Sequence, residues 1–323
     1  MKIVLWIFLV LLFLYLVFVL APSVFSFLYS YSRREGKDLD TLPVKWLQKT
    51  QYRDHLDRIF QGNRWYREQA EKMPVYTIQS FDGLKLAAHY LDQGAKKLAI
   101  LVHGFHTTVG NNFGVIAQDL VEFGWNLLFV DQRCFGSSEG HFCCYGLKEQ
   151  YDVLSWIDFA EKEFRPEEIL LFGVSMGGAT VSFASDKIDN PKVKLAVNDC
   201  AFTSIYELQM LTAKIFRVPG KVMMPYVEHF TKWFLGINIR QSTEESLRNA
   251  KVPFFFIHGA ADEAVPLEWG NRNYAACGSE KEQLVIEDAG HAVAYIASGD
   301  DGKEKLRQIL NQYFSEKEEE KHE

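Results

Sequence analysis

The stretch Gly173–Gly178, which reads Gly-Val-Ser-Met-Gly-Gly, decides the fold of this chain. It follows the apolar run Ile169–Phe172, a predicted strand, and it precedes a helical pattern. A serine displayed at so tight a turn needs small residues two positions before and after it, because the backbone crowds there. The N-terminus of the following helix directs free N–H groups at negative charge that develops near the serine. Ser175 is therefore the predicted nucleophile, with Gly173 and Gly177 as supporting residues.

A second motif, His103-Gly104-Phe105-His106, directly follows another predicted strand. The backbone N–H groups of Phe105 and Met176 can converge on one oxygen, and we expect them to form an oxyanion hole. His103 is predicted to be a structural, hydrogen-bonding side chain, and Gly104 a supporting residue. The two histidines lack the third ligand and the His-Glu-x-x-His spacing of a zinc site, so we expect no metal here.

Two later loops supply a candidate acid and a candidate base. Asp262 follows the predicted strand Pro253–Ile257, where a carboxylate can accept an imidazole N–H, and it is the preferred acid. Asp199, which follows the preceding predicted strand, is the alternative acid. His291 follows the last predicted strand, after Gly290, which permits a close turn. The chain order Ser, Asp, His is the one that a serine on this kind of turn requires, so His291 is the predicted general base.

These motifs resemble those of the α/β-hydrolase superfamily, over residues 75–314. The segment Asp131–Gly140 resembles the family's D-x-R-G-x-G-x-S segment, but it has Cys134 where glycine is usual; Asp131 and Arg133 are interpreted as structural. The nearest resemblance is to membrane-anchored, single-domain serine hydrolases related to serine aminopeptidases and monoglyceride lipases. This resemblance implies cleavage of an ester, thioester or amide through an acyl-enzyme intermediate, without a cofactor.

Eight short apolar runs alternate with helical stretches between residues 74 and 315, which predicts an α/β fold with a mostly parallel, twisted sheet flanked by helices. An antiparallel hairpin around Phe81-Asp82-Gly83 is expected to open the sheet. Predicted helices include Tyr145–Phe164, Met176–Ser185 and Lys303–Phe314. From about 203 to 246 the pattern is helical and apolar, which indicates a cap. Residues 33–73 are predicted to be a helical connector, and residues 316–323 a charged tail.

Residues 1–32 are predicted to be a transmembrane anchor, because Ile3–Ser32 contains no charged side chain. A helix of this length spans about 45 Å, against about 30 Å of hydrocarbon. A cleaved signal peptide and a buried core helix are the alternatives. The apolar run exceeds the usual 7–15 residues of a signal, and Ala21-Pro22-Ser23 is a poor cleavage site. The basic residues within Arg33–Lys37 favour a cytoplasmic soluble domain.

Composition excludes some functions. The 323 residues include 42 acidic and 35 basic side chains, for a net charge of −7, which argues against a nucleic-acid partner. The five cysteines form no Cys-x-x-Cys pair and are more typical of reduced thiols than of a disulfide framework. The stretch 173–178 lacks the features of a phosphate-binding or dinucleotide-binding loop, so no cofactor is expected.

The expected partners are therefore the membrane and a small-molecule or lipophilic acyl substrate, and the oligomeric state stays open. Carboxylesterase or lipase-like activity is the first expectation. A serine aminopeptidase is the alternative, and it would need a carboxylate near the cap for the substrate amine. The candidate carboxylates for that amine are Glu207, Glu228, Glu244 and Glu245. A non-catalytic binding module on the same fold and cofactor-free haloperoxidase or lyase chemistry also stay open.

Overall fold

The structure, a computed structural model, describes residues 2–314, so the predicted tail at 316–323 lies outside the described residues. The described chain forms an eight-stranded sheet of order β1-β2-β4-β3-β5-β6-β7-β8. The first two pairings are antiparallel and the other pairings are parallel, which confirms the predicted fold class and the opening hairpin. The strands are β1 (Val75–Gln79), β2 (Lys85–Leu91), β3 (Lys97–Val102), β4 (Asn126–Asp131), β5 (Glu168–Val174), β6 (Val193–Asp199), β7 (Phe254–Gly259) and β8 (Lys281–Ile286).

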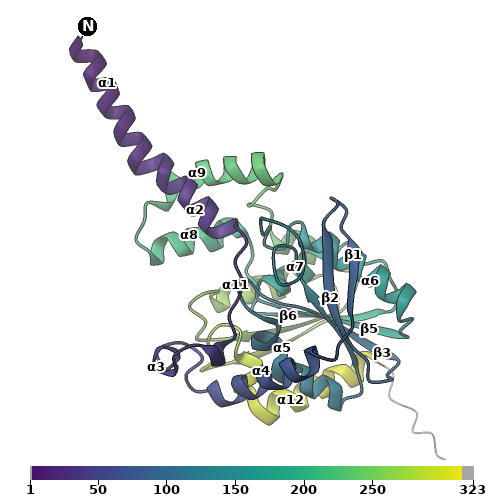
Figure 1. Cartoon of the computed structure of the whole chain (residues 1–323). Helices are drawn as coiled ribbons and strands as arrows, with labels where there is room; N and C mark the ends of the chain where they lie inside the picture. Colours follow the sequence, from purple (N-terminus) through teal and green to yellow (C-terminus); the bar gives the residue numbers. More distant parts are fainter. Residues whose placement is uncertain (1, 315–323) are drawn as a thin grey trace, which may run out of the picture.

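Helices cover both faces of the sheet (Figure 1). Successive side chains of β5 point to opposite faces, as the pleat of a strand requires. Leu170 and Phe172 pack with helices α5 and α12, whereas Ile169 and Leu171 pack with α6 and α7. The continuous apolar runs of the sequence are therefore strands that are buried on both faces. The bounds are α5 (Val109–Glu122), α6 (Glu149–Glu163), α7 (Met176–Ala184), α11 (Leu267–Ala276) and α12 (Ala294–Tyr313).

Two predicted helices have different starting points. Helix α6 begins at Glu149 rather than Tyr145, because Tyr145 has a positive φ of 51° and the Glu149 carboxylate accepts the N–H groups of Cys144 and Gly146 in this loop. Helix α12 begins at Ala294, nine residues before the predicted start. It contains a kink at Gly299, whose φ of 61° interrupts the helical periodicity.

Between β6 and β7 the described chain is helical and lies over the end of the sheet that carries Ser175 (Figure 1). Ser204 caps the first helix by accepting the N–H of Glu207, and Pro225 lies inside the second helix. These elements are α8 (Ile205–Ile215), α9 (Gly220–Phe230), the π-helical turn η3 (Thr231–Leu235) and α10 (Thr243–Leu247).

The N-terminal segment is one apolar helix over Lys2–Tyr31, and its outer part projects away from the body (Figure 1). It is long and apolar enough to cross a membrane, and its length and composition fit an anchor or a signal sequence. Its most apolar 18-residue window is not buried, so it is not a core helix. The helix comprises α1 (Lys2–Tyr15), η1 (Leu16–Leu20) and α2 (Ala21–Tyr31), and the connector contains η2 (Leu39–Thr41), α3 (Val44–Leu47) and α4 (Leu56–Ala70).

Candidate active site

Ser175 lies on a strained turn between β5 and α7. Its backbone has φ 55° and ψ −114°, in a region that non-glycine residues rarely occupy. A Cβ atom built on Gly173 would lie 2.2 Å from the carbonyl oxygen of Gly177, and a Cβ on Gly177 would lie 1.8 Å from that of Val102. Both glycines are therefore required sterically, because β3, β5 and the start of α7 approach each other too closely for any side chain.

The structure brings the three predicted side chains together from three loops. Ser175 Oγ–H donates to His291 Nε2 (2.8 Å), and His291 Nδ1–H donates to Asp262 Oδ2 (2.7 Å). The other oxygen of Asp262 accepts the N–H groups of Ala264 (2.9 Å) and Val265 (2.8 Å). The Asp262 side chain is fully buried, and both of its oxygens accept hydrogen bonds. The arrangement can transfer a proton from the serine to the imidazole.

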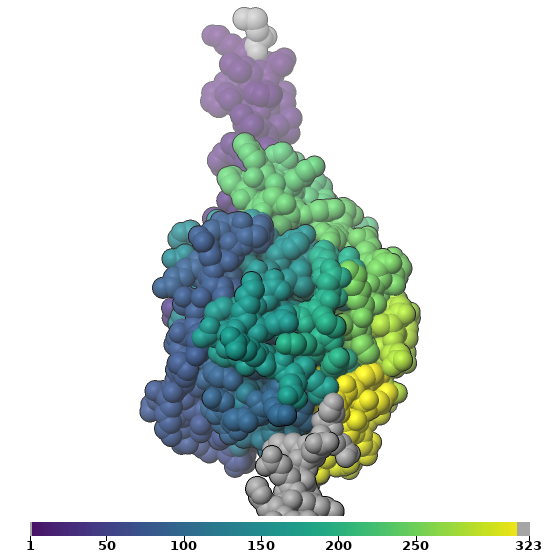
Figure 2. All heavy atoms as spheres, turned by 90° about the vertical axis from the view of Figure 1, so that its right-hand side faces the viewer, coloured from purple at the N-terminus to yellow at the C-terminus, as the bar shows by residue number. Residues whose placement is uncertain are grey.

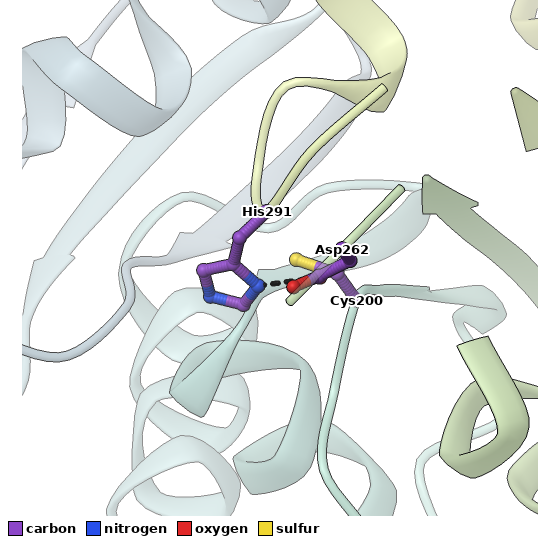
Figure 3. Close-up of side chains that lie close together, drawn as sticks. All are labelled: Cys200, Asp262 and His291. Atoms are coloured by element: carbon purple, nitrogen blue, oxygen red, sulfur yellow. Dashed lines mark hydrogen bonds and ion pairs between the residues drawn. The ribbon is translucent and has the colours of Figure 1, made fainter. Parts of the chain in front are cut away.

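The alternative acid, Asp199, does not hydrogen-bond with His291. Burial raises its pKa to about 7, and its Oδ1 has no hydrogen-bond partner among the described residues. The adjacent Cys200 lies closer to the site: its Sγ, a carboxylate oxygen of Asp262 and a ring nitrogen of His291 all lie within 4.8 Å of one another (Figure 3). Burial raises the pKa of the Cys200 thiol well above its usual range, which disfavours the thiolate that a metal ion needs.

The His103–His106 segment lies beside the serine. A Cβ atom on Gly104 would be 3.2 Å from Ser175 Cβ, and the Gly104 N–H donates to Asn112 Oδ1 (2.8 Å). His103 is buried; its Nδ1–H donates to the Gly104 carbonyl (2.7 Å), and its Nε2 accepts the backbone N–H of Gln132 (3.2 Å). Both of its ring nitrogens are thus engaged within the loop.

The predicted oxyanion donors both border one cavity with the serine. Phe105, Met176, Ser175 and His291 line a space of about 630 Å³ under the cap. Met176 is the first residue of α7, where a backbone N–H has no partner within the helix. The cavity walls are largely apolar, and the cap contributes the side chains of Leu208, Met223, Met224 and Val227.

Comparisons with known proteins bear on the fold of the chain. A family model described as serine aminopeptidase, S33, matches residues 93–230. An esterase of Pyrococcus furiosus, Pf2001, superposes with a TM-score of 0.63 at 20% identity, over 77% of this chain and 96% of the esterase. An esterase of Exiguobacterium antarcticum gives a TM-score of 0.55 at 18% identity, over 73% and 98%. The chain therefore has the fold of the α/β hydrolases.

Sequence relatives cover most of this chain. The uncharacterized protein YqkD of Bacillus subtilis is 24% identical over 248 residues, which are 76% of this chain and 81% of YqkD. The uncharacterized protein YfhR of Escherichia coli is 23% identical over 245 residues, which are 74% and 78% of the two chains. The family match and the esterase neighbours support a hydrolase of this fold.

Two features of this site were not predicted from the sequence. His258, at the end of β7, is buried, and its Nε2–H donates to the carbonyl of Val265 (2.8 Å) beside the Asp262 carboxylate (3.7 Å). Burial lowers the pKa of His258, so this side chain is neutral and braces the acid loop. The only signal in the sequence was a histidine directly before that loop.

The second feature that was not predicted is the contact of the connector, residues 33–73, with the site. Gln51 Nε2 donates to the carbonyl of His291 (3.1 Å), and a Cβ on Gly290 would lie 2.7 Å from Gln51 Cβ. On the other side of the site, Thr108 Oγ donates to the carboxylate of Asp38 (2.6 Å). The connector therefore packs against both loops that flank Ser175.

The segment after β4 has the structural contacts expected of it. The Arg133 guanidinium is buried and makes a bidentate contact with Asp152 (2.6 and 2.7 Å) and a second contact with Asp82 (2.9 Å). Asp131 accepts the N–H of Ser137 (2.8 Å). Cys134, at the position where glycine is usual, has a φ of 72°, which explains that preference.

Three of the four carboxylates considered for an aminopeptidase have arginine partners. Arg272 pairs with Glu207 (2.8 Å) and Glu244 (2.7 Å), and Arg240 pairs with Glu228. Glu245 is exposed at the start of α10. None of the four residues lines the cavity that contains Ser175.

Proposed function

We propose that this chain is a serine hydrolase with carboxylesterase or lipase-like activity, which cleaves an ester, thioester or amide through an acyl-enzyme. The observation that carries the proposal is the continuous hydrogen-bond chain from Ser175 through His291 to Asp262 at one end of an apolar cavity. Acyl transfer requires a nucleophile, a base and a group that orients the base. Ser175, His291 and Asp262 are the candidates for these three roles.

In the proposed reaction, Ser175 Oγ attacks the substrate carbonyl carbon while His291 Nε2 takes its proton. Asp262 stabilises the imidazolium through the Nδ1–H bond. The N–H groups of Phe105 and Met176 hold the oxyanion of the tetrahedral intermediate. His291 then protonates the leaving group as the carbon–leaving-group bond breaks. A water molecule repeats the sequence on the acyl-enzyme, releases the acid and restores the Ser175 hydroxyl.

The test is a serine replacement in the full chain. Ser175→Ala should abolish labelling by a fluorophosphonate and lower the turnover of p-nitrophenyl butyrate by at least about 10⁴-fold. Ser185→Ala is the matched control, because Ser185 is buried at the end of α7 and its hydroxyl has no partner within residues 2–314. Labelling of Ser175→Ala at the wild-type level would refute the nucleophile. Failure of the wild-type protein to react would favour a non-catalytic binding module.

A serine aminopeptidase is the second candidate, and the family model is the observation that favours it. The arginine pairs of Glu207, Glu228 and Glu244 leave these carboxylates poorly placed to bind a substrate amine. Steady-state rates on aminoacyl amides and on acyl esters separate the two activities. A higher kcat/KM for aminoacyl p-nitroanilides than for acyl esters would establish the peptidase instead.

We also propose that the N-terminal helix is retained as a membrane anchor, with the soluble domain on the cytoplasmic side. Its inner part is integrated into the fold, because Phe27 and Tyr31 of α2 are buried. Mass spectrometry of the N-terminus in purified membranes tests retention. Protease accessibility of the soluble domain in intact cells tests the side, since a cytoplasmic domain is protected there.

A further inference from the structure

We propose that α2 forms one wall of the acyl-binding site and that this site takes a long-chain fatty acyl group delivered from a lipid bilayer. The inference rests on the proposed hydrolase function and names its substrate class. Its starting observation is that the cavity containing Ser175 and His291 is also lined by Pro22, Phe25 and Ser26 of the N-terminal helix. The proposed anchor is therefore part of the site.

The helix α2 is held in place by specific contacts with the cap. The ring of Phe27 lies 5.9 Å from that of Phe230 and 6.0 Å from that of Phe234. Gln209 Nε2, on α8, donates to the hydroxyl oxygen of Tyr31 (2.6 Å). Aromatic contacts of this kind and a partly buried hydrogen bond hold a fixed geometry, so the wall formed by α2 has a defined position.

The chemistry of the cavity suits an aliphatic chain. Opposite α2, the cap presents apolar side chains of α8 and α9, among them Leu208 and the flexible thioethers of Met223 and Met224. In the part of the chain that the structure describes, no Asp, Glu, Lys or Arg side chain lines the cavity, so it offers no counter-charge to a charged substrate group. The volume of about 630 Å³ lies within the range of about 300–1,000 Å³ that is typical of small-molecule sites.

The rim of the cavity lies beside the proposed membrane anchor. Phe25 and Phe216 both line the cavity, yet each is 68% exposed, so they mark its rim. The cap also exposes the apolar side chains of Trp233 and Phe234. The cap lies at the base of the projecting helix (Figure 2). Its exposed basic residues are Lys214, Arg217, Lys221 and Lys232.

Aromatic and basic side chains beside an apolar helix are typical of a surface that sits in the headgroup region of a membrane. Since the rim residues belong to both the membrane helix and the cap, a lipid acyl chain can enter between α2 and α8 without crossing water. The bond to be cleaved would then lie at Ser175, at the inner end of the cavity.

The decisive measurement is the chain-length preference of the full-length protein in detergent micelles. Each methylene that enters an apolar site strengthens binding by about fourfold. We expect kcat/KM for p-nitrophenyl dodecanoate to exceed that for the butyrate by at least tenfold. Ser26→Trp, which fills the cavity from α2, should lower this ratio at least tenfold. Val24→Trp, on the same helix and 38% exposed but outside the cavity lining, should leave the ratio unchanged.

Thermal melting shows whether Ser26→Trp folds, and Ala213→Trp on the opposite wall provides a second test of the same ratio. A wild-type preference for the butyrate, or an unchanged ratio in both cavity variants, would overturn the acyl site while the hydrolase function stands. If the wild-type protein cleaves neither ester and resists fluorophosphonate, the proposed function itself fails.

A separate experiment tests whether the acyl substrate is delivered from the bilayer. The protein is reconstituted in vesicles of phosphatidylcholine and phosphatidylglycerol, and a long-chain monoglyceride is placed in the same vesicles or in separate ones. Hydrolysis at least tenfold faster in the shared bilayer supports lateral delivery. Equal initial rates in the two arrangements would show that the acyl group arrives through water.

Discussion

Replacing Asp262 with asparagine tests the site most sharply, because the surrounding hydrogen bonds dictate how the amide must lie. One carboxylate oxygen accepts two backbone N–H groups, from Ala264 and Val265, and the other accepts His291 Nδ1–H. If the amide NH₂ faced the two backbone donors, both would lose their acceptor, at about 1–3 kcal/mol each. The amide oxygen therefore stays with the backbone and the NH₂ group faces His291.

This orientation forces the wrong tautomer on the base. With an NH₂ group opposite Nδ1, the His291 proton moves to Nε2, which then cannot accept the proton of Ser175. We expect kcat to fall by about 10⁴-fold while the thermal unfolding temperature changes little, since the amide has nearly the same volume.

The assay is the steady-state hydrolysis of p-nitrophenyl butyrate by detergent-solubilised full-length protein. Asp199→Asn is the matched control, because Asp199 is also buried at the carboxyl end of the sheet but does not bond His291. Its kcat should remain within about threefold of the wild type. A loss of less than tenfold in Asp262→Asn would refute the assigned acid. A comparable loss in Asp199→Asn alone would transfer the role to Asp199.

Three further outcomes are expected. Gly177→Ala should lower kcat/KM by more than about 100-fold, because the added Cβ would lie 1.8 Å from the Val102 carbonyl oxygen and displace the serine turn. Ester hydrolysis measures this loss, and near-wild-type activity of the variant would contradict the prediction. Arg133→Met should lower the free energy of unfolding by about 3–5 kcal/mol, because it leaves the buried Asp152 carboxylate without its partner; denaturant titration at neutral pH measures the loss. Burial raises the pKa of Asp199 from near 3.8 to about 7. Between these pH values the folded state therefore holds one more proton than the unfolded state. The free energy of unfolding should fall as the pH rises through this window, by up to about 4 kcal/mol. Asp199→Asn should reduce that fall in melting curves between pH 5 and pH 8, and an unchanged pH profile would contradict the shift.

Much of the fold could be predicted because its signals are local. Buried parallel strands are continuous apolar runs, and the predicted strands Ile169–Phe172 and Pro253–Ile257 correspond to β5 and β7, each within two residues of the observed bounds. The serine turn could also be predicted from a local signal, because the glycines that permit it lie within two residues of Ser175. The identity of the acid was open between two loop carboxylates. Only the positions of the β6 and β7 loops relative to His291 distinguish Asp262 from Asp199.

The unpredicted features depend on contacts between distant parts of the chain. Gln51 reaches the carbonyl of His291 across 240 residues of sequence, and no periodicity encodes such a pairing. Two unusual backbone conformations could not be predicted from the sequence either. The positive φ of Tyr145 moves the start of α6 to a later residue, and Gly299 introduces a kink in α12. Such conformations follow from tertiary packing and not from the propensity of the residue itself.

The position of the connector bears on where the catalytic unit begins. Asp38 holds the loop that follows β3 through Thr108, Gln51 holds the loop of the proposed base, and Arg58 donates to the carbonyl of Ile296 (2.6 Å) just beyond that loop. Loops keep a geometry only where other elements fix them, and hydrolysis requires the serine and the base to stay within hydrogen-bonding distance. We therefore infer that the functional unit starts at α2 and not at β1. The N-terminal helix contributes a wall of the cavity, the connector positions the loops beside Ser175, and the sheet supplies the turn that displays the serine.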